Sequence, residues 1–118
     1  LLWRYKSNSS VSTSPAVVDG VVYAGATYAD AHLYALGASA GNLLWRFHIG
    51  TTPRGKPAVE GGVVYVGSDG GHIHALDTSN GDLVWRYETG GNVYSSPAIA
   101  GGVVYVGSND YYLYALVE

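Results

Sequence analysis

The chain has 118 residues, including six Lys or Arg and nine Asp or Glu, which gives a formal net charge of −3. This low charge density offers no basic patch to a phosphate backbone, so we expect no nucleic-acid partner. The absence of Cys excludes disulfides, thiol chemistry and zinc sites of the Cys type. Apolar runs are far shorter than a bilayer, so no membrane insertion is expected, and the length corresponds to one small domain, residues 1–118.

In chain order, the sequence predicts short strands separated by turns. Asp19-Gly20 is a hairpin signal between two β-branched runs, and Gly61-Gly62 stands at the corresponding place further along. No apolar period of 3.6 residues persists long enough to indicate a helix. The expected strands are residues 1–5, 13–18, 21–26, 32–36, 43–48, 56–59, 63–68, 72–77, 83–88, 95–100, 103–108 and 112–117.

The same order of residue types occurs three times. Trp is followed by Arg at Trp3, Trp45 and Trp85, with a spacing of 42 and then 40 residues. The first copy carries a two-residue insertion around residues 27–30, where a turn can accommodate it. Short antiparallel strands, four to a repeat of about 40 residues, predict an all-β fold, a β-propeller with three four-stranded blades. A β-sandwich would not repeat residue types in register.

Residues 75–85 read Ala-Leu-Asp-Thr-Ser-Asn-Gly-Asp-Leu-Val-Trp. This stretch resembles the pyrroloquinoline quinone (PQQ) repeat, Ala-x-Asp-x-x-Thr-Gly-x-x-x-Trp, with Asn80 in place of Thr, and residues 35–45 resemble it more weakly. The resemblance covers the whole chain. It implies tryptophan docking, in which a Trp lies against a turn of the next blade and joins the two blades. The residues to which it assigns this structural role are Trp3, Trp45, Trp85, Asp77, Gly41 and Gly81.

The residue types suit that role physically. An indole buries a large apolar area while its N–H still needs a carbonyl acceptor. A turn Asp hydrogen-bonds its own backbone, and a turn Gly permits positive φ. We therefore expect these residues to hold the fold together rather than to carry out chemistry.

The resemblance also bears on catalysis. Quinoprotein dehydrogenases of this type imply a calcium ion, a catalytic Asp and commonly an adjacent-Cys disulfide over the cofactor. The Cys pair is absent here, and no Asp outside the turns stands out as a base. We therefore expect no enzyme activity and no cofactor, but a module for scaffolding or protein–protein interaction, located outside the cytoplasm as the resemblance implies. The alternatives are a fragment of a PQQ-dependent dehydrogenase or of a ligand-binding propeller, and an engineered or excised fragment with no independent role.

The frame of the repeat predicts self-assembly. Blades are expected at residues 13–48, 56–88 and 95–117, and the third lacks its Trp strand, while residues 1–5 form a Trp strand without a sheet. Closed propellers have about four to eight blades, and unpaired edges are liabilities. We expect a homodimeric six-bladed ring in which residues 1–5 of each copy complete the third blade of the other. The rival interpretation is a piece of a longer natural propeller.

Few residues are candidates for binding. His72 and His74 share one face of a strand, as metal ligands can, but the equivalent positions hold His or Tyr, which favours a packing role. Asp69, Asn109 and Asp110 lack the alternating oxygen ligands of a calcium loop, and turn chemistry explains them. The remaining candidates do not repeat between copies and fall beside the connections into the first strands: Lys6, Arg54, Lys56 and Asn92.

Overall fold

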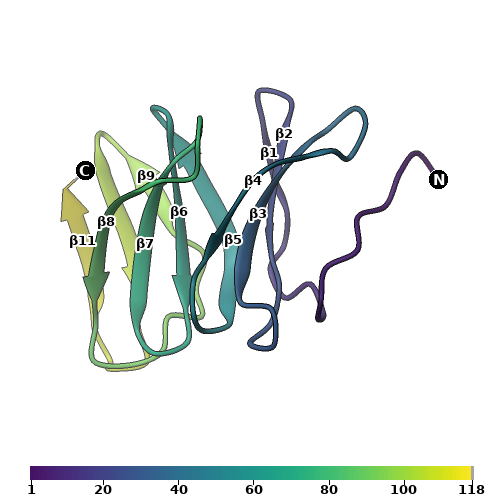
Figure 1. Cartoon of the computed structure of the whole chain (residues 1–118). Helices are drawn as coiled ribbons and strands as arrows, with labels where there is room; N and C mark the ends of the chain where they lie inside the picture. The colour runs from purple at the N-terminus through teal and green to yellow at the C-terminus, as the bar shows by residue number, and fades with distance from the viewer. Residues whose placement is uncertain (118) are drawn as a thin grey trace.

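The computed structural model describes residues 1–117, which form eleven β-strands and no helix. The strands make three antiparallel sheets that stand in a row (Figure 1). The all-β prediction is therefore confirmed, and the described residues include no helix able to cross a membrane. Glu118, the last residue of the predicted domain, lies outside the described residues.

Sheet 1 has the order β1-β2-β3-β4, so each strand pairs with the next along the chain. Val18 pairs with Val21 across the two-residue turn Asp19-Gly20, whose φ angles are 51° and 75°. Positive φ at both positions is the geometry that matches the twist of a tight hairpin. The turn therefore forms as its sequence predicts. The four strands are β1 (Ala16–Val18), β2 (Val21–Gly25), β3 (His32–Gly37) and β4 (Leu43–His48).

Sheets 2 and 3 repeat this arrangement. Sheet 2 has the order β5-β6-β7-β8, whereas sheet 3 has three strands in the order β11-β10-β9. The pairing register repeats as well, because Tyr23 opposes Ala35 in sheet 1 as Tyr65 opposes Ala75 in sheet 2 and Tyr105 opposes Ala115 in sheet 3. The strands are β5 (Pro53–Glu60), β6 (Val63–Ser68), β7 (His72–Asp77), β8 (Leu83–Glu88), β9 (Ala98–Ala100), β10 (Val103–Gly107) and β11 (Leu113–Val117).

Some boundaries differ from the prediction. The strand expected at residues 56–59 begins at Pro53, because Pro53 and Arg54 already pair with Ser68 and Gly67 before the register shifts. The strands expected at 13–18 and 95–100 are shortened to β1 and β9. Residues 1–5 form no strand, since no ladder partner lies beside them among residues 1–117. Backbone pairing, not residue type, decides whether an extended segment is a strand.

The core lies between the sheets. Tyr23, Leu33 and Trp45 of sheet 1 pack in one cluster with Val64 and Val66 of sheet 2. Sheet 2 makes the same kind of contact with sheet 3. Each sheet thus buries one face against the next, and the N-terminal segment and β11 lie at opposite ends of the row (Figure 1).

Candidate functional site

Two Trp side chains reach across to the last turn of a neighbouring sheet. Trp45 on β4 donates its indole N–H to the Thr78 carbonyl over 2.8 Å, in the turn between β7 and β8. Trp3 donates to the Ala38 carbonyl over 2.8 Å, in the turn between β3 and β4. The third, Trp85 on β8, packs with Val104 and Leu116 of sheet 3. The same contact is therefore made twice, once from a strand and once from the unpaired N-terminal segment.

Glycine makes room for both indoles. Gly41 and Gly81 have φ of 72° and 79°. A Cβ added to Gly41 would lie 2.5 Å from the Trp3 ring, and one added to Gly81 would lie 2.5 Å from the Trp45 ring. Each ring therefore lies flat on a peptide that only Gly provides without strain.

The turn below Trp45 is held by its own side chains. The Asp77 carboxylate accepts hydrogen bonds from the Ser79 hydroxyl at 2.6 Å and from the Ser79 backbone N–H at 2.8 Å. These two bonds lower the pKa of Asp77. An Asp that bonds its own backbone two residues on forms an Asx turn. Asp77 thus shapes the turn through its Oδ1, which accepts both bonds.

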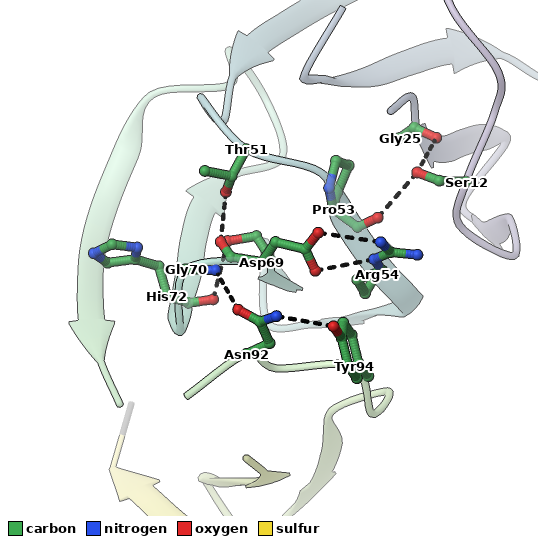
Figure 2. Close-up of polar contacts among 11 residues, drawn as sticks. Ser12, Gly25, Thr51, Pro53, Arg54, Asp69, Gly70, His72, Asn92 and Tyr94 are labelled. Carbon is green, nitrogen blue, oxygen red and sulfur yellow. Dashed lines mark hydrogen bonds and ion pairs between the residues drawn. The ribbon is translucent and has the colours of Figure 1, made fainter. Parts of the chain in front are cut away.

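Two of the four binding candidates meet in a polar network (Figure 2). Arg54 forms a bidentate pair with Asp69, with N–O distances of 3.0 and 3.1 Å, and its guanidinium lies 5.2 Å from the Tyr94 ring centre. Asn92 donates to the Tyr94 hydroxyl at 2.8 Å and accepts from the Gly70 N–H at 2.7 Å. The hydrogen bonds from Arg54 to Asp69 raise the pKa of Arg54. The network ties the β6–β7 turn to the connection between β8 and β9.

We expect Asp69→Asn to lower the free energy of unfolding by less than about 1 kcal/mol, because the pair is partly solvated, with Arg54 40% and Asp69 29% exposed. Urea unfolding at low and high salt measures this, and the loss should shrink with salt. Asp82→Asn, which removes the same charge from an exposed turn, is the control. A loss of several kcal/mol at Asp69, or equal losses at both positions, would contradict this interpretation.

The other two candidates lie apart from the network. Lys56 donates its backbone N–H to the Ser96 hydroxyl at 2.7 Å and borders a hollow of about 330 Å³ between the first strands of the sheets, with Val17 and Pro97. Lys6 lies exposed on the N-terminal segment. The structure therefore unites Arg54 and Asn92 and leaves Lys56 and Lys6 separate.

Asp30 and Asp110 each pair with a Tyr hydroxyl, a repeated contact that the sequence analysis did not predict. Asp30 accepts a short hydrogen bond from the Tyr34 hydroxyl, and Asp110 accepts one from Tyr114. Burial acts to raise the pKa of Asp30, but the bonds from Tyr34 and Asn8 outweigh it, so this pKa lies below its ordinary value. Burial, and then Asp30, raise the pKa of Tyr34 to about 12. In the sequence, this pairing is indicated only by the spacing Asp-x-x-x-Tyr in the first and third copies.

The second repeat has Gly70 and His74 where the others have Asp and Tyr. His74 is 2% exposed, and its Nδ1 has no hydrogen-bond partner among residues 1–117. Burial, and then the charges of His72 and Arg86, lower the pKa of His74 to about 4. His72, by contrast, reaches Glu88 at 3.0 Å on the strand alongside. His74 thus packs in the interior, whereas His72 lies near the surface beside Glu88.

The residues described do not fit a calcium-quinone centre. No three His, Asp or Glu side chains among residues 1–117 cluster as metal ligands. The carboxylates of Asp30, Asp69 and Asp110 are each taken up by hydrogen bonds or an ion pair within the chain.

The two ends of the row carry uncovered apolar faces. In sheet 3, Tyr105 is 39% and Leu113 76% exposed, although the equivalent residues of sheets 1 and 2 are at most 2% exposed. At the other end, Val22 and Ala24 of sheet 1 are half-buried, although their equivalents in sheets 2 and 3 are fully buried. A hollow of about 170 Å³ lies there. It is lined by Trp3, Tyr5, Ser7, Val11, Val22, Ala24, Gly25, Tyr34 and Leu36.

Comparisons place this geometry among known proteins. A family model described as outer membrane protein assembly factor BamB matches residues 1–53 and 29–117. BamB from Moraxella catarrhalis has a similar structure, with a TM-score of 0.87 and 24% identity over 98% of this chain and 37% of its own. No match was found among curated protein sequences. The chain thus spans well under half of that structure.

Two further solved structures share the architecture. Quinohemoprotein alcohol dehydrogenase ADHIIG from Pseudomonas putida HK5 has a TM-score of 0.83 and 25% identity over 98% of this chain and 20% of its own. The computationally designed Ika4 protein has a TM-score of 0.77 and 18% identity over 87% of this chain and 63% of its own. The β-propeller prediction is confirmed by these neighbours, and so is the resemblance to PQQ repeats.

Proposed function

The chain belongs to the family of the outer membrane protein assembly factor BamB, and from this premise we propose that it is a non-catalytic propeller module that pairs with a second copy and serves as a scaffold for other proteins. Because the family description names an assembly factor of the outer membrane, we propose that the module acts outside the cytoplasm. Trp3, Trp45 and Trp85, with the turn residues Gly41, Gly81 and Asp77, act in this proposal as blade-docking residues.

The observation that carries the proposal is the complementarity of the two ends. Within the chain, Tyr23 and Leu33 of sheet 1 cover Val64 and Val66 of sheet 2. At the ends, the covering residues of sheet 3 are exposed, and the residues of sheet 1 that correspond to the covered ones are only half-buried. An exposed apolar face of this kind favours association. In a dimer with two-fold symmetry, sheet 3 of each copy would pack against sheet 1 of the other. Both pairs of end faces would then be buried, and the six blades would close a ring.

The native mass tests the assembly. We expect light scattering at micromolar concentration to give twice the chain mass of 12.4 kDa. The rival interpretation is that the missing blades belong to the same polypeptide, as the 37% coverage of the Moraxella structure favours. A monomeric mass, or open-ended aggregates, would support that rival and overturn the dimer.

We expect Leu113→Asp to separate the two copies, raising Kd by about 100-fold or more, because a carboxylate would be buried without a partner. The single chain should still fold, since Leu113 is 76% exposed in it. Sedimentation velocity measures the shift. Tyr28→Asp, at a side chain 73% exposed in the β2–β3 turn, is the matched control and should leave the dimer intact. Dissociation by both variants, or by neither, would contradict the proposed interface.

The non-catalytic part has its own test. The carboxylates described above are occupied within the chain, which supports a structural role. We expect no quinone absorbance and no dye reduction with alcohols when PQQ and calcium are added. Either signal would support the alternative of a fragment from a PQQ-dependent dehydrogenase.

A further inference from the structure

We propose that the edge of β11 binds residues 1–6 of a second copy as an antiparallel fourth strand, in the register that places Tyr114 opposite Arg4 and Ala115 opposite Trp3 of that copy. This inference rests on the self-assembly proposed above. It adds the residue-by-residue alignment of the two strands, which the packing of the end faces does not require.

The edge strand lacks a neighbour on one side. β11 pairs with β10, and sheet 3 has no strand beyond it among residues 1–117. Along β11 the side chains alternate between exposed and half-buried, whereas four consecutive residues of β3 and of β7 are fully buried. An apolar strand with an unpaired row of N–H and C=O groups is a template for another strand. Sheet 3 can therefore pair with a fourth strand along the edge of β11.

Residues 1–6 already have the shape of that strand. Their exposure alternates as it does along β4, with Trp3 and Tyr5 turned inward and Arg4 and Lys6 outward. This alternation is imposed by sheet 1, because Trp3 bonds the Ala38 carbonyl and the Tyr5 ring lies 5.4 Å from the Tyr34 ring. The segment is thus anchored and extended without a ladder, so pairing costs it little further ordering entropy.

The register follows from the repeat. In sheet 1, Tyr34 opposes Arg46 and Ala35 opposes Trp45, and a bulge then follows. Sheet 2 repeats this pairing with Arg86 and Trp85, and the bulge recurs. Transferred to β11, the alignment places Tyr114 opposite Arg4 and Ala115 opposite Trp3. Continued to the residue before β11, it places Tyr112 opposite Lys6. The cation of Lys6 then lies beside the exposed ring of Tyr112, a favourable contact.

In this proposal the segment that pairs with β11 belongs to a second copy. The N-terminal segment and β11 lie at opposite ends of the row of sheets (Figure 1). Pairing within one chain would require Trp3 to leave the Ala38 carbonyl and the Gly41 peptide on which it lies. Between two copies, each segment keeps its anchor on its own sheet 1 and adds its free edge to the other chain.

Cysteine cross-linking tests the register, since the chain has no Cys of its own. Lys6 and Tyr112 are both exposed, so Lys6→Cys with Tyr112→Cys should not disturb folding. Directly opposed β-strand residues have Cβ atoms about 5 Å apart, which is close enough for a disulfide after small adjustment. We expect mild oxidation to give a covalent dimer on denaturing gels, and a short bismaleimide to give the same product without the disulfide geometry. The control is Lys6→Cys with Val117→Cys, because Val117 is 80% exposed and lies five residues further along, about 16 Å from Tyr112 in an extended strand.

Each result decides a separate point. A covalent dimer from the variant with Lys6→Cys and Tyr112→Cys, but not from the control variant, supports the register. A native dimer that neither reagent links in that variant, or that links equally in the control, overturns the register and leaves the end-face dimer standing. A monomeric native mass of the unmodified protein overturns the self-assembly and this inference with it.

Discussion

Replacing Gly81 by alanine is expected to lower the free energy of unfolding by about 4 kcal/mol. Of this, about 1–2 kcal/mol comes from forcing a side chain to φ of 79°. The rest comes from displacing Trp45, since the new Cβ would lie 2.5 Å from its ring. Urea unfolding followed by Trp fluorescence measures the loss.

Gly20→Ala is the matched control. Gly20 has φ of 75°, and nothing lies within 4 Å of an added Cβ there, so only the backbone cost should appear. Trp45→Ala should cost about 3–5 kcal/mol. In that background Gly81→Ala should lose its additional effect, a coupling of about 2 kcal/mol in a double-mutant cycle. Equal costs at Gly81 and Gly20, or additive costs with Trp45, would contradict the docking role.

Lowering the pH from 7 to 4 is expected to remove about 3 kcal/mol of stability through His74 alone. In the folded chain its pKa is about 4, against an ordinary value of 6.5. The unfolded chain therefore takes up a proton below pH 6.5 that the folded chain takes up only near pH 4. The contribution of His74 to the free energy of unfolding is fully present above pH 6.5. It falls by about 1.4 kcal/mol per pH unit between pH 6.5 and 4.

His74→Phe should flatten the pH profile between 6.5 and 4, because Phe fills the site beside Phe47 without a group to protonate. The groups that face His74 are His72, 5.9 Å away between ring centres, and Arg86 on the strand opposite, and neither is altered by this variant. Urea unfolding at several pH values measures the difference. If the wild type and the variant lose stability equally over this window, then His74 is not the group responsible.

Much of the fold could be read from local chemistry. The turn at Asp19-Gly20 forms as its residues predict, because its conformation depends on those residues alone. The start of β5 could not be read in this way. Pro53 and Arg54 join the ladder because Ser68 and Gly67 lie beside them, and their own sequence carries no strand signal.

The candidate site, too, could be predicted from the sequence only in part. Arg54 and Asn92 stood out because they do not repeat, yet their meeting through Asp69 and Tyr94 depends on two connections that are distant in sequence. The couple of Asp30 with Tyr34 was visible as a spacing, but its burial was not. Residue identity indicates which contacts a side chain can make, and the fold decides which of them are present.

The three-fold repeat of short strands follows from the order of the amino acids, because residue periodicity and turn chemistry are local properties. The burial of each copy of a repeated residue, by contrast, depends on how the sheets pack. Leu33, Ile73 and Leu113 occupy one position of the repeat, yet only Leu113 is exposed. Leu33 and Ile73 are each covered by a neighbouring sheet, whereas sheet 3 has no further sheet beside it among residues 1–117.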